Sequence, residues 1–500
     1  MQKRYDVCII GAGEAGLCAA YELKKKAPFL SIVIIEQGNE ISKRNCPKND
    51  KKIGVCANCN PCNIMKGLGG AGGHSDGKFN ITDEYGGNLL DYISSDELID
   101  LLNYVDSINI EFGATDEITD HNNDFVKSFK KKILIEHELQ LLTGKVKHYG
   151  TDKNKEILTK FYNYLVENGV EFLFNTKVEE ISACYSLDLS NGEKVYCDYL
   201  IAAPGRAGSA WLSEQCKKLG IKVSNNQVDI GVRVEVPAEV LEDITNVMYE
   251  AKIRYRTKCH GHNVRTFCMN PNGFVVNENV DGIVTVNGHS NSKDGKKSKN
   301  TNFALLVSLS FTEPFKEPNK YGRAIASTMN MLAGGDVIVQ RFGDLKAGKR
   351  STEKKLKDCS LIPTLKAVAG DLGLAIPKEP LEDIIETLEV LNKAIPGIAN
   401  DDTLLYGIEV KFYSDRLETN EKLEVCGYQN FYAVGDGAGV TRGLAQAGAS
   451  GIIAARDIVS NVLEDPHYID KKAEYEKALE EKRIAEQNLN EEYNIVTEEL

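Results

Sequence analysis

The sequence predicts an α/β fold in which a parallel, doubly wound domain is assembled from discontinuous segments and carries an inserted, mostly antiparallel β (α+β) domain. Three observations support this prediction. Residues 5–36 show the order strand, turn, helix, strand. A strand followed by a helix of small residues returns at 431–458. The region 211–400 instead contains short strand-like runs separated by turn residues, such as "NPNG" at 270–273.

The composition narrows the class of protein. A chain of 500 residues is expected to form two or three domains. Its net charge is −13 and it has no run of five Lys or Arg residues, which argues against a nucleic-acid-binding protein. No run of eighteen apolar residues is present, so no membrane span is expected. Because the N-terminus has no signal-like apolar region, we expect a cytoplasmic protein whose 13 cysteines are mostly reduced.

The segment 5–36 has the order that a dinucleotide-binding fingerprint requires. Gly11, Gly13 and Gly16 follow the first strand at GxGxxG spacing. Gly11 permits a tight turn, Gly13 lets the backbone approach a pyrophosphate, and Gly16 allows the helix to pack closely on the strand. Glu36, at the end of the second strand, can accept hydrogen bonds from ribose hydroxyls. An acid at this place favours FAD or NAD over NADP.

A second signal favours FAD. The strand at 431–434 runs into Gly435 and Asp436, and a helix of small residues follows at about 443–458. An acid at the carboxyl end of a parallel strand lies where such sheets bind ligands, so Asp436 can bond to ribityl hydroxyls. The next helix would direct its positive N-terminus at the flavin ring and help to hold negative charge there.

A third segment completes the predicted domain. A helix that ends at Gly169 is followed by a strand reaching Val178, and a further strand ends in "AAPG" at 202–205. With these pieces the chain resembles the bacterial flavoproteins described as FAD-dependent dehydrogenases or NAD(P)/FAD-dependent oxidoreductases, which have a glutathione-reductase-type FAD fold. The motifs that carry the resemblance are "CANCNPCNIMKGLGGAGGHSDGK", "TVNGHSN", "QRFGDLKAGKRST", "EVKFYSDR" and "YAVGDGAGVTRGLAQAGASG".

The resemblance implies a Rossmann-like FAD-binding domain formed by residues 1–45, 150–210 and 401–460. We expect a cysteine- and glycine-rich loop with a helical insertion at 46–149, a substrate domain at 211–400 and a charged C-terminal helix at 461–500. The residues expected to bind FAD, from the motifs and the resemblance together, are Gly11, Gly13, Glu14, Ala15, Gly16, Glu36, Gln37, Gly70, Ala71, the backbone of Val178, Ala203, Gly205, Gly435, Asp436, Gly443 and Leu444.

Four cysteines, Cys46, Cys56, Cys59 and Cys62, form the pattern C-x9-C-x2-C-x2-C. Three cysteines at CxxCxxC spacing with a remote Cys-Pro are similar to the ligands of a 4Fe–4S cluster, although the remote cysteine precedes the triplet here. Four thiolates could equally hold a structural zinc ion. A metal-free dithiol or a purely structural role is the third alternative. The spacing leaves all three open.

The glycines that follow, "GLGGAG" at 67–72, match GxGxxG but have no preceding strand of sufficient length. We therefore interpret this segment as a flavin-contacting loop in which backbone N–H groups at 69–73 approach the pyrophosphate or the ring. Ser75 and Asp76 could turn toward the ribityl chain. A plain flexible loop is the alternative.

No residue is assigned as the catalytic acid or base. His260 and His262 in "KCHGHNVR" could be a metal pair or proton-transfer groups, although such residues are more often turn histidines. The other candidates are His289, Tyr413, Arg416 and Arg442. The arginines could bind a substrate carboxylate or the ring edge of the flavin, or they could form structural ion pairs.

These features predict an FAD-dependent oxidoreductase that transfers a hydride between a small organic substrate and flavin N5. Formation and reduction of a carbon–carbon double bond are both compatible with this chemistry. Because no second dinucleotide fingerprint is present, NAD(P)H would act only as a transient electron donor. The alternatives are a flavin monooxygenase and a non-catalytic flavin or iron–sulfur redox sensor. The charged C-terminal segment could be a solvated helix or a contact between copies in a homo-oligomer.

Overall fold

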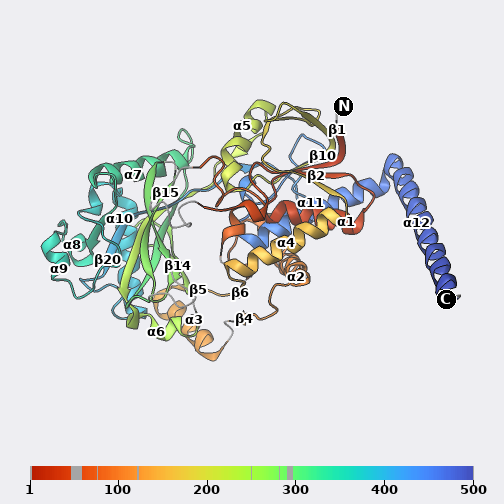
Figure 1. Ribbon diagram of the computed structural model, residues 1–500. Coiled ribbons are helices and arrows are strands. Elements are labelled where there is room, and N and C mark those ends of the chain that lie inside the picture. Colours follow the sequence, from red (N-terminus) through yellow and green to blue (C-terminus); the bar gives the residue numbers. More distant parts are fainter. Residues whose placement is uncertain are drawn as a thin grey trace. The chain divides into compact units, whose positions relative to one another are not determined.

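The structure is a computed structural model that describes residues 3–46, 59–75, 77–120, 123–248, 250–280, 282–289 and 297–498. The chain forms two compact units (Figure 1). Unit 1 comprises Met1–Ile118, Val146–Ser224 and Ser414–Leu500, and unit 2 comprises Thr119–Lys145 and Asn225–Tyr413. Among the described residues, no helix combines the length and the apolar character needed to cross a membrane.

Unit 1 is built on a seven-stranded sheet with the order β7-β2-β1-β10-β9-β8, in which β22 also pairs with β10. Five of its strands are parallel, and β8 and β9 form an antiparallel extension. The parallel strands are β1 (Lys3–Ile10), β2 (Ile32–Ile35), β7 (Val170–Leu173), β10 (Lys194–Ala202) and β22 (Phe431–Ala433). The extension consists of β8 (Val178–Ile181) and β9 (Ser186–Leu189).

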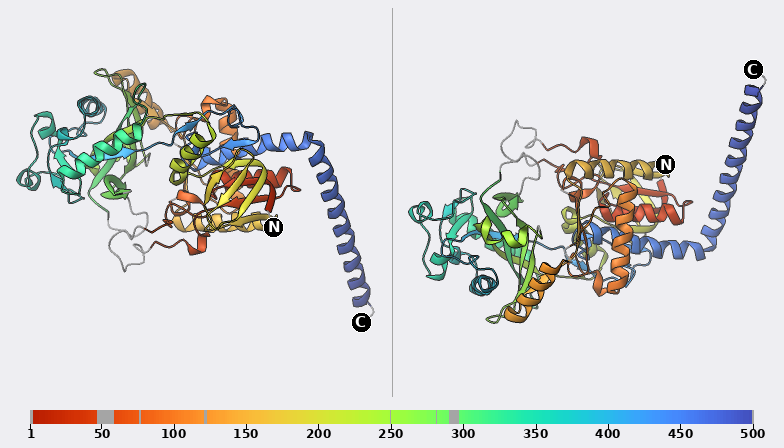
Figure 2. Two further views of the ribbon diagram at one scale, coloured as in Figure 1. Left: turned by 90° about the horizontal axis from the view of Figure 1, so that it is seen from above. Right: turned by 90° about the horizontal axis from the view of Figure 1, so that it is seen from below.

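The central strands of unit 1 are apolar because helices and loops cover both faces of the sheet, as is usual for parallel sheets. All four residues of β2, "IVII", are buried. Helix α1 (Glu14–Lys26) packs against α11 (Leu444–Glu464) and α4 (Thr151–Glu167), and α11 also contacts α2 (Ser95–Glu111) (Figure 1 and Figure 2). The predicted α/β class with a Rossmann-like domain of discontinuous segments is confirmed.

One strand of unit 1 differs from the prediction. The strand after Gly169 ends at Leu173, and Val178 instead begins the antiparallel strand β8. Asn175 between them has a left-handed backbone (φ 53°), and its N–H donates to the carbonyl of Gly38. This turn interrupts the extended chain, because a left-handed residue cannot continue a strand.

Unit 2 contains an eight-stranded sheet with the order β19-β18-β20-β12-β17-β14-β13-β5. Only the pair β18–β19 is parallel, so the domain is mostly antiparallel as expected. The strands are β5 (Gln140–Leu142), β12 (Val228–Pro237), β13 (Lys252–Arg256), β14 (Asn263–Asn270), β17 (Asn300–Leu309), β18 (Ile338–Arg341), β19 (Val368–Ala369) and β20 (Leu404–Lys411).

The units divide the chain at places other than the expected boundaries. Strand β20 lies in unit 2 rather than in the FAD-binding domain, because it pairs with β12 and β18. Helix α5 (Ser209–Leu219) and β11 (Val223–Ser224), expected in the substrate domain, lie in unit 1, where β11 pairs with β21 (Arg416–Leu417). The insertion 46–149 is shared between the two units.

Strand β12 shows why the sheet of unit 2 has two unlike faces. Its sequence "VDIGVRVEVP" alternates with period two, so the valines and Ile230 point to one face and Asp229, Arg233 and Glu235 to the other. Helices α7 (Pro318–Leu332) and α10 (Lys378–Ala394) contribute to the same apolar core as the valines. The hairpin of β15 (Phe274–Val280) and β16 (Ile283–His289) lies near the polar side chains, since a β-carbon on Gly288 would be 2.6 Å from Arg233 Nη2.

The remaining elements are short or peripheral. Those of unit 1 are β3 (Lys78–Ile81) and the C-terminal helix α12 (Pro466–Glu498). Those of unit 2 are β4 (Thr119–Asp120), α3 (Asp124–His137), α6 (Glu242–Thr245), α8 (Phe342–Lys346) and α9 (Glu353–Lys357). Strand β6 (Lys145–His148) lies where the chain passes between the units.

Candidate functional site

The carboxyl ends of three parallel strands meet in unit 1. Ile10 of β1 is in register with Ala202 of β10, and Ala202 is in register with Ala433 of β22. The segments that follow these strands therefore start side by side, and the N–H of Ala203 donates to the carbonyl of Ile10 at 2.8 Å. Ligands of parallel α/β sheets bind at this edge.

The Gly11–Gly16 turn is tightly packed at Gly11, where no side chain fits, and it is open at Gly13. Gly11 has φ +106°, and a β-carbon there would lie 2.2 Å from the carbonyl oxygen of Ala203, so only glycine fits. A β-carbon on Gly13 would meet no atom within 4 Å. Gly13 is the N-cap of α1 and no side chain caps it, so the first N–H groups of the helix remain available to an anion.

Glu36 joins the turn to the glycine-rich segment. Its Oε2 accepts from Ala12 N at 3.0 Å, and its Oε1 accepts from Gly38 N at 2.8 Å and from Gly67 N at 2.9 Å. A carboxylate oxygen has two lone pairs, so Oε2 retains one acceptor position. This remaining position could accept a hydrogen bond from a ribose hydroxyl. That bond stays a prediction.

The glycine-rich segment lies against the first turn. The N–H of Gly69 donates to the carbonyl of Ala12 at 2.7 Å, and a β-carbon on Gly70 would be 3.3 Å from Gly13 Cα. The segment continues as a short 3₁₀ helix, η2 (Gly70–His74), and not as a second strand–turn–helix unit. A β-carbon on Gly72 would be 2.5 Å from Leu444 Cδ2, so η2 also meets the start of α11.

Arg44 holds this segment in place. Its side chain is fully buried, and Nε donates to Asn63 O at 2.9 Å while Nη2 donates to Ile64 O and Gly70 O, both at 2.8 Å. Nη1 donates to Leu68 O. Burial lowers the pKa of Arg44 to about 10, so the guanidinium is still charged at neutral pH. The sequence does not predict this role of Arg44, because a single arginine in a loop belongs to no motif or hydrophobic periodicity.

Asp436 follows the carboxyl end of strand β22. Its Oδ1 accepts from Thr441 Oγ1 at 2.8 Å and from Gly443 N at 3.3 Å, and Arg206 Nε is 3.8 Å from Oδ2. Burial raises the pKa of Asp436, while Arg206, Thr441 and Gly443 oppose that rise. Both oxygens of the carboxylate therefore have partners within the chain, and the carboxylate still has acceptor capacity for a ligand.

The two distant signals, the first turn and the Gly-Asp pair, come together in the fold. A β-carbon on Gly435 would be 3.2 Å from the β-carbon of Ala15 in α1. Gly443 begins α11 without a side-chain cap, and a β-carbon there would meet no atom within 4 Å. Two uncapped helix N-termini, those of α1 and α11, therefore lie in unit 1 at segments adjoining the carboxyl edge of the sheet.

Among the described residues, five buried polar atoms of unit 1 have no hydrogen-bond partner: His74 Nε2, Asn80 Oδ1, Asp106 Oδ1, Tyr149 Oη and Gln446 Oε1. His74 ends η2, and burial together with Arg44 lowers its pKa, which keeps the imidazole neutral at pH 7. Gln446 lies in the first turn of α11. Because an unpaired buried polar atom costs free energy, His74 and Gln446, on two elements that meet at Gly72 and Leu444, fit a site that is completed by a ligand with polar edges.

Four other residues that the sequence places at the FAD site are found in or next to the same segments. Gln37 directly follows Glu36, Ala71 lies in η2, and Gly205 begins the turn after β10. The Glu14 side chain is buried and accepts from Asn109 Nδ2 of α2 at 3.3 Å. Asp76 and Cys56 lie outside the described residues.

Two of the catalytic candidates have structural partners. Arg416 forms an ion pair with Asp91 at 2.6 Å, and its guanidinium lies 4.9 Å from the centre of the Tyr92 ring. The ion pair corresponds to the structural alternative named for the arginines in the sequence. A cavity of about 600 Å³ beside them is lined by none of the residues expected to bind FAD. Tyr413 belongs to unit 2, and its hydroxyl bonds to Asp229, so the structure assigns Tyr413 and Arg416 to different units.

The four-cysteine motif is only partly described. Cys46, Cys59 and Cys62 carry free thiols. Among the described residues these three do not gather closely enough to share a metal ion, whereas Cys259, His260 and Asp383 of unit 2 do. A metal centre at the four cysteines stays a prediction.

Comparisons with known proteins agree with this geometry. Residues 227–412 match the family described as FAD-dependent protein, C-terminal domain-like, and residues 9–51 match the NAD(P)-binding Rossmann-like domain. The chain thus combines a segment similar to the NAD(P)-binding Rossmann-like domain with a segment similar to the C-terminal domain of FAD-dependent proteins. The first match covers most of unit 2, and the second covers the end of β1, α1, β2 and Arg44. The expected resemblance is thereby confirmed.

The solved structures to which this chain is similar are distant in sequence. Glycine oxidase from Geobacillus kaustophilus is 12% identical with a TM-score of 0.32, over 92% of this chain and 95% of that chain. L-proline dehydrogenase from P. horikoshii is 11% identical with a TM-score of 0.34, over 93% and 94%. A 2-methyl-3-hydroxypyridine-5-carboxylic acid oxygenase is 13% identical with a TM-score of 0.33, over 95% and 87%. No curated protein sequence matches.

Proposed function

We propose that this protein is an FAD-dependent oxidoreductase that transfers a hydride between a small organic substrate and flavin N5, as a dehydrogenase or reductase. The observation that carries the proposal is the meeting of the Gly11–Gly16 turn with Asp436 at one edge of the sheet, beside the helix N-termini of α1 and α11. Bound FAD would supply the redox chemistry itself. NAD(P)H would be a transient donor, since residues 211–400 contain no second dinucleotide fingerprint.

Different residues of the chain would bind different parts of FAD. The amides at the start of α1 bind the pyrophosphate, and the backbone near Gly13 allows it to approach. The free acceptor position of Glu36 binds the adenosine ribose, and Asp436 binds the ribityl hydroxyls. The uncapped N-terminus of α11 would present the positive end of the helix dipole to a bound flavin and would favour its reduced, negatively charged form.

Flavin content tests the cofactor site. Protein purified without oxygen should be yellow and release about one FAD per chain. Asp436→Ala should lose most of the flavin, whereas Asp188→Ala, which changes an exposed aspartate of β9 in the same unit, should keep it. Colourless wild-type protein that does not take up added FAD would contradict the proposal.

Electron-transfer assays test the reaction class. A dehydrogenase or reductase should pass electrons from NADH or NADPH to a quinone, a dye or an α,β-unsaturated ketone without stoichiometric uptake of oxygen. A hydroxylated product formed only under oxygen would identify a monooxygenase instead. Normal FAD content without turnover for any donor and acceptor pair would identify a redox sensor.

We also propose that Cys46, Cys56, Cys59 and Cys62 hold a 4Fe–4S cluster or a zinc ion, which their spacing supports. Iron with acid-labile sulfide, both lost in Cys56→Ser, would identify a cluster. Zinc lost in the same variant would identify a structural zinc site. Metal content unchanged by Cys56→Ser would refute both.

A further inference from the structure

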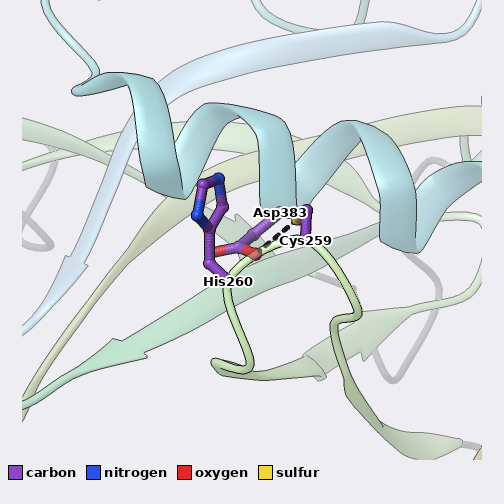
Figure 3. Close-up of side chains that lie close together, drawn as sticks. All are labelled: Cys259, His260 and Asp383. Atoms are coloured by element: carbon purple, nitrogen blue, oxygen red, sulfur yellow. Dashed lines mark hydrogen bonds between the residues drawn. The ribbon is translucent and has the colours of Figure 1, made fainter.

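A cluster of side chains of metal-binding types lies in unit 2, whereas most of the residues expected to bind FAD belong to unit 1. The turn at 257–262 connects β13 to β14 and packs against α10. The turn contributes Cys259 and His260, and α10 contributes Asp383 (Figure 3). One ligand atom from each of these three residues lies within 4.8 Å of the other two.

The contacts within the cluster are short. Cys259 Sγ donates to Asp383 Oδ1 at 3.2 Å, the bond that is dashed in Figure 3. His262 Nδ1 lies 2.7 Å from the second oxygen of Asp383. His260 Nε2 lies 2.9 Å from Oε2 of Glu382, which precedes Asp383 in α10. A thiol, two imidazoles and a buried carboxylate thus share one small volume.

The charge balance of the cluster is incomplete. The Asp383 side chain is fully buried, and its partners are a thiol and an imidazole that is 27% exposed. Within the described part of the chain, neither lysine nor arginine forms an ion pair with Asp383. Glu382 and Glu386 of the same helix add further negative charge nearby. Because it is costly to bury a carboxylate that no lysine or arginine neutralises, the cluster favours the addition of a cation.

The turn is already held in the shape that would bind such a cation. Glu386 accepts from the backbone N–H groups of Lys258 at 2.7 Å and Cys259 at 3.0 Å, and from the hydroxyl of Tyr255 at 2.8 Å. Thr257 N also donates to His262 O at 3.0 Å. A site whose ligands are positioned by other bonds loses little conformational entropy when it binds an ion.

We propose that Cys259, His260 and Asp383 bind one zinc-class divalent cation and that His262 orients the Asp383 carboxylate from its other oxygen. Zn²⁺ binds thiolate, imidazole and carboxylate at about 2.0–2.3 Å, whereas Mg²⁺ and Ca²⁺ prefer oxygen ligands alone. The proton that Cys259 now shares with Asp383 leaves to solvent when the ion binds. A water completes the coordination, and the ion fastens the β13–β14 turn to α10.

Cobalt titration tests the site, because Co²⁺ reports a thiolate ligand by near-UV charge-transfer absorption. Chelator-treated full-length protein with Cys46, Cys56, Cys59 and Cys62 all replaced by Ser should bind one Co²⁺ per chain with this absorption. Adding Cys259→Ser should abolish the absorption, and adding Asp383→Asn should weaken the affinity at least tenfold. Adding Cys426→Ser, which changes an exposed free cysteine of unit 1, should have no effect.

Absence of cobalt binding, or an absorption that survives Cys259→Ser, would overturn the proposal. If the fourfold serine variant does not fold, the natural chain answers the same question: Cys259→Ser should lower bound zinc by one ion per chain, and an unchanged zinc content would refute the site. The proposal is independent of the flavin function, because FAD content should stay the same in Cys259→Ser.

Discussion

Gly451 of α11 lies directly against the carbonyl oxygen of Ala15 in α1, since a β-carbon on Gly451 would be 2.1 Å from that oxygen. These two helices supply the N-termini of the proposed flavin site. Their separation is therefore set by a backbone contact that tolerates no side chain. Any residue that pushes the helices apart should move both N-termini.

Gly451→Ala tests this contact. The added methyl group should destabilise unit 1 by about 1–3 kcal/mol, as is typical of overpacked cores, and should lower FAD content. Thermal unfolding and flavin release measure the two effects. Ser460→Ala, on the exposed side of the same helix, is the control and should change neither. Full FAD content with wild-type unfolding in Gly451→Ala would contradict the role of this contact.

Arg44→Lys tests the buried guanidinium. Lysine has three donors on one nitrogen and cannot reach the four carbonyls that Arg44 bonds, so at least one carbonyl loses its partner. We expect faster proteolysis in the segment 59–75 and reduced FAD content. Lys43→Arg, at the exposed neighbouring position, is the matched control. Unchanged proteolysis of Arg44→Lys would show that the segment does not depend on this side chain.

Glu14→Gln tests a pH dependence of stability. Burial raises the pKa of Glu14 to about 7 from its ordinary value of 4.5. The folded state therefore holds more protons than the unfolded state between these pH values, and the stability of the wild type falls as pH rises through this window. Because glutamine does not ionise, the stability of Glu14→Gln should not fall in this way as the pH rises.

The stability of Glu14→Gln relative to the wild type should thus increase between pH 5 and pH 8, by up to about 3 kcal/mol. Urea unfolding of FAD-saturated protein at several pH values measures it. Glu193→Gln, which changes an exposed glutamate of unit 1, provides the reference. A difference between Glu14→Gln and wild type that is independent of pH would refute the prediction.

Glu409→Leu tests the buried ion pair of unit 2. Arg233 Nε lies 3.3 Å from Glu409 Oε2, and both side chains are fully buried. Removing the glutamate leaves the guanidinium without its counter-charge and should cost about 3–5 kcal/mol. The double variant Arg233→Met with Glu409→Leu should cost much less than the sum of the single changes. Additive single costs, measured by urea unfolding, would rule out this coupling.

Local patterns were sufficient for much of the fold. The strand–turn–helix–strand order around Gly11 and the period-two alternation of 229–236 both predict the elements that form. They succeed because turn geometry and the burial of one strand face depend on neighbouring residues. Strand 404–411 shows the limit: its sequence reads as a strand, yet only pairing with β12 and β18 assigns it to unit 2.

The class of this protein can be predicted from its amino-acid sequence, because the glycine spacing and the acids at strand ends are short-range signals for a dinucleotide. Which single residues act together depends instead on how the chain packs in three dimensions. Arg44 bonds to carbonyls up to 26 positions away, and Cys259 meets Asp383 across 124 positions. Such pairs carry no local periodicity, since they form only when the packing of whole elements compensates the loss of chain entropy.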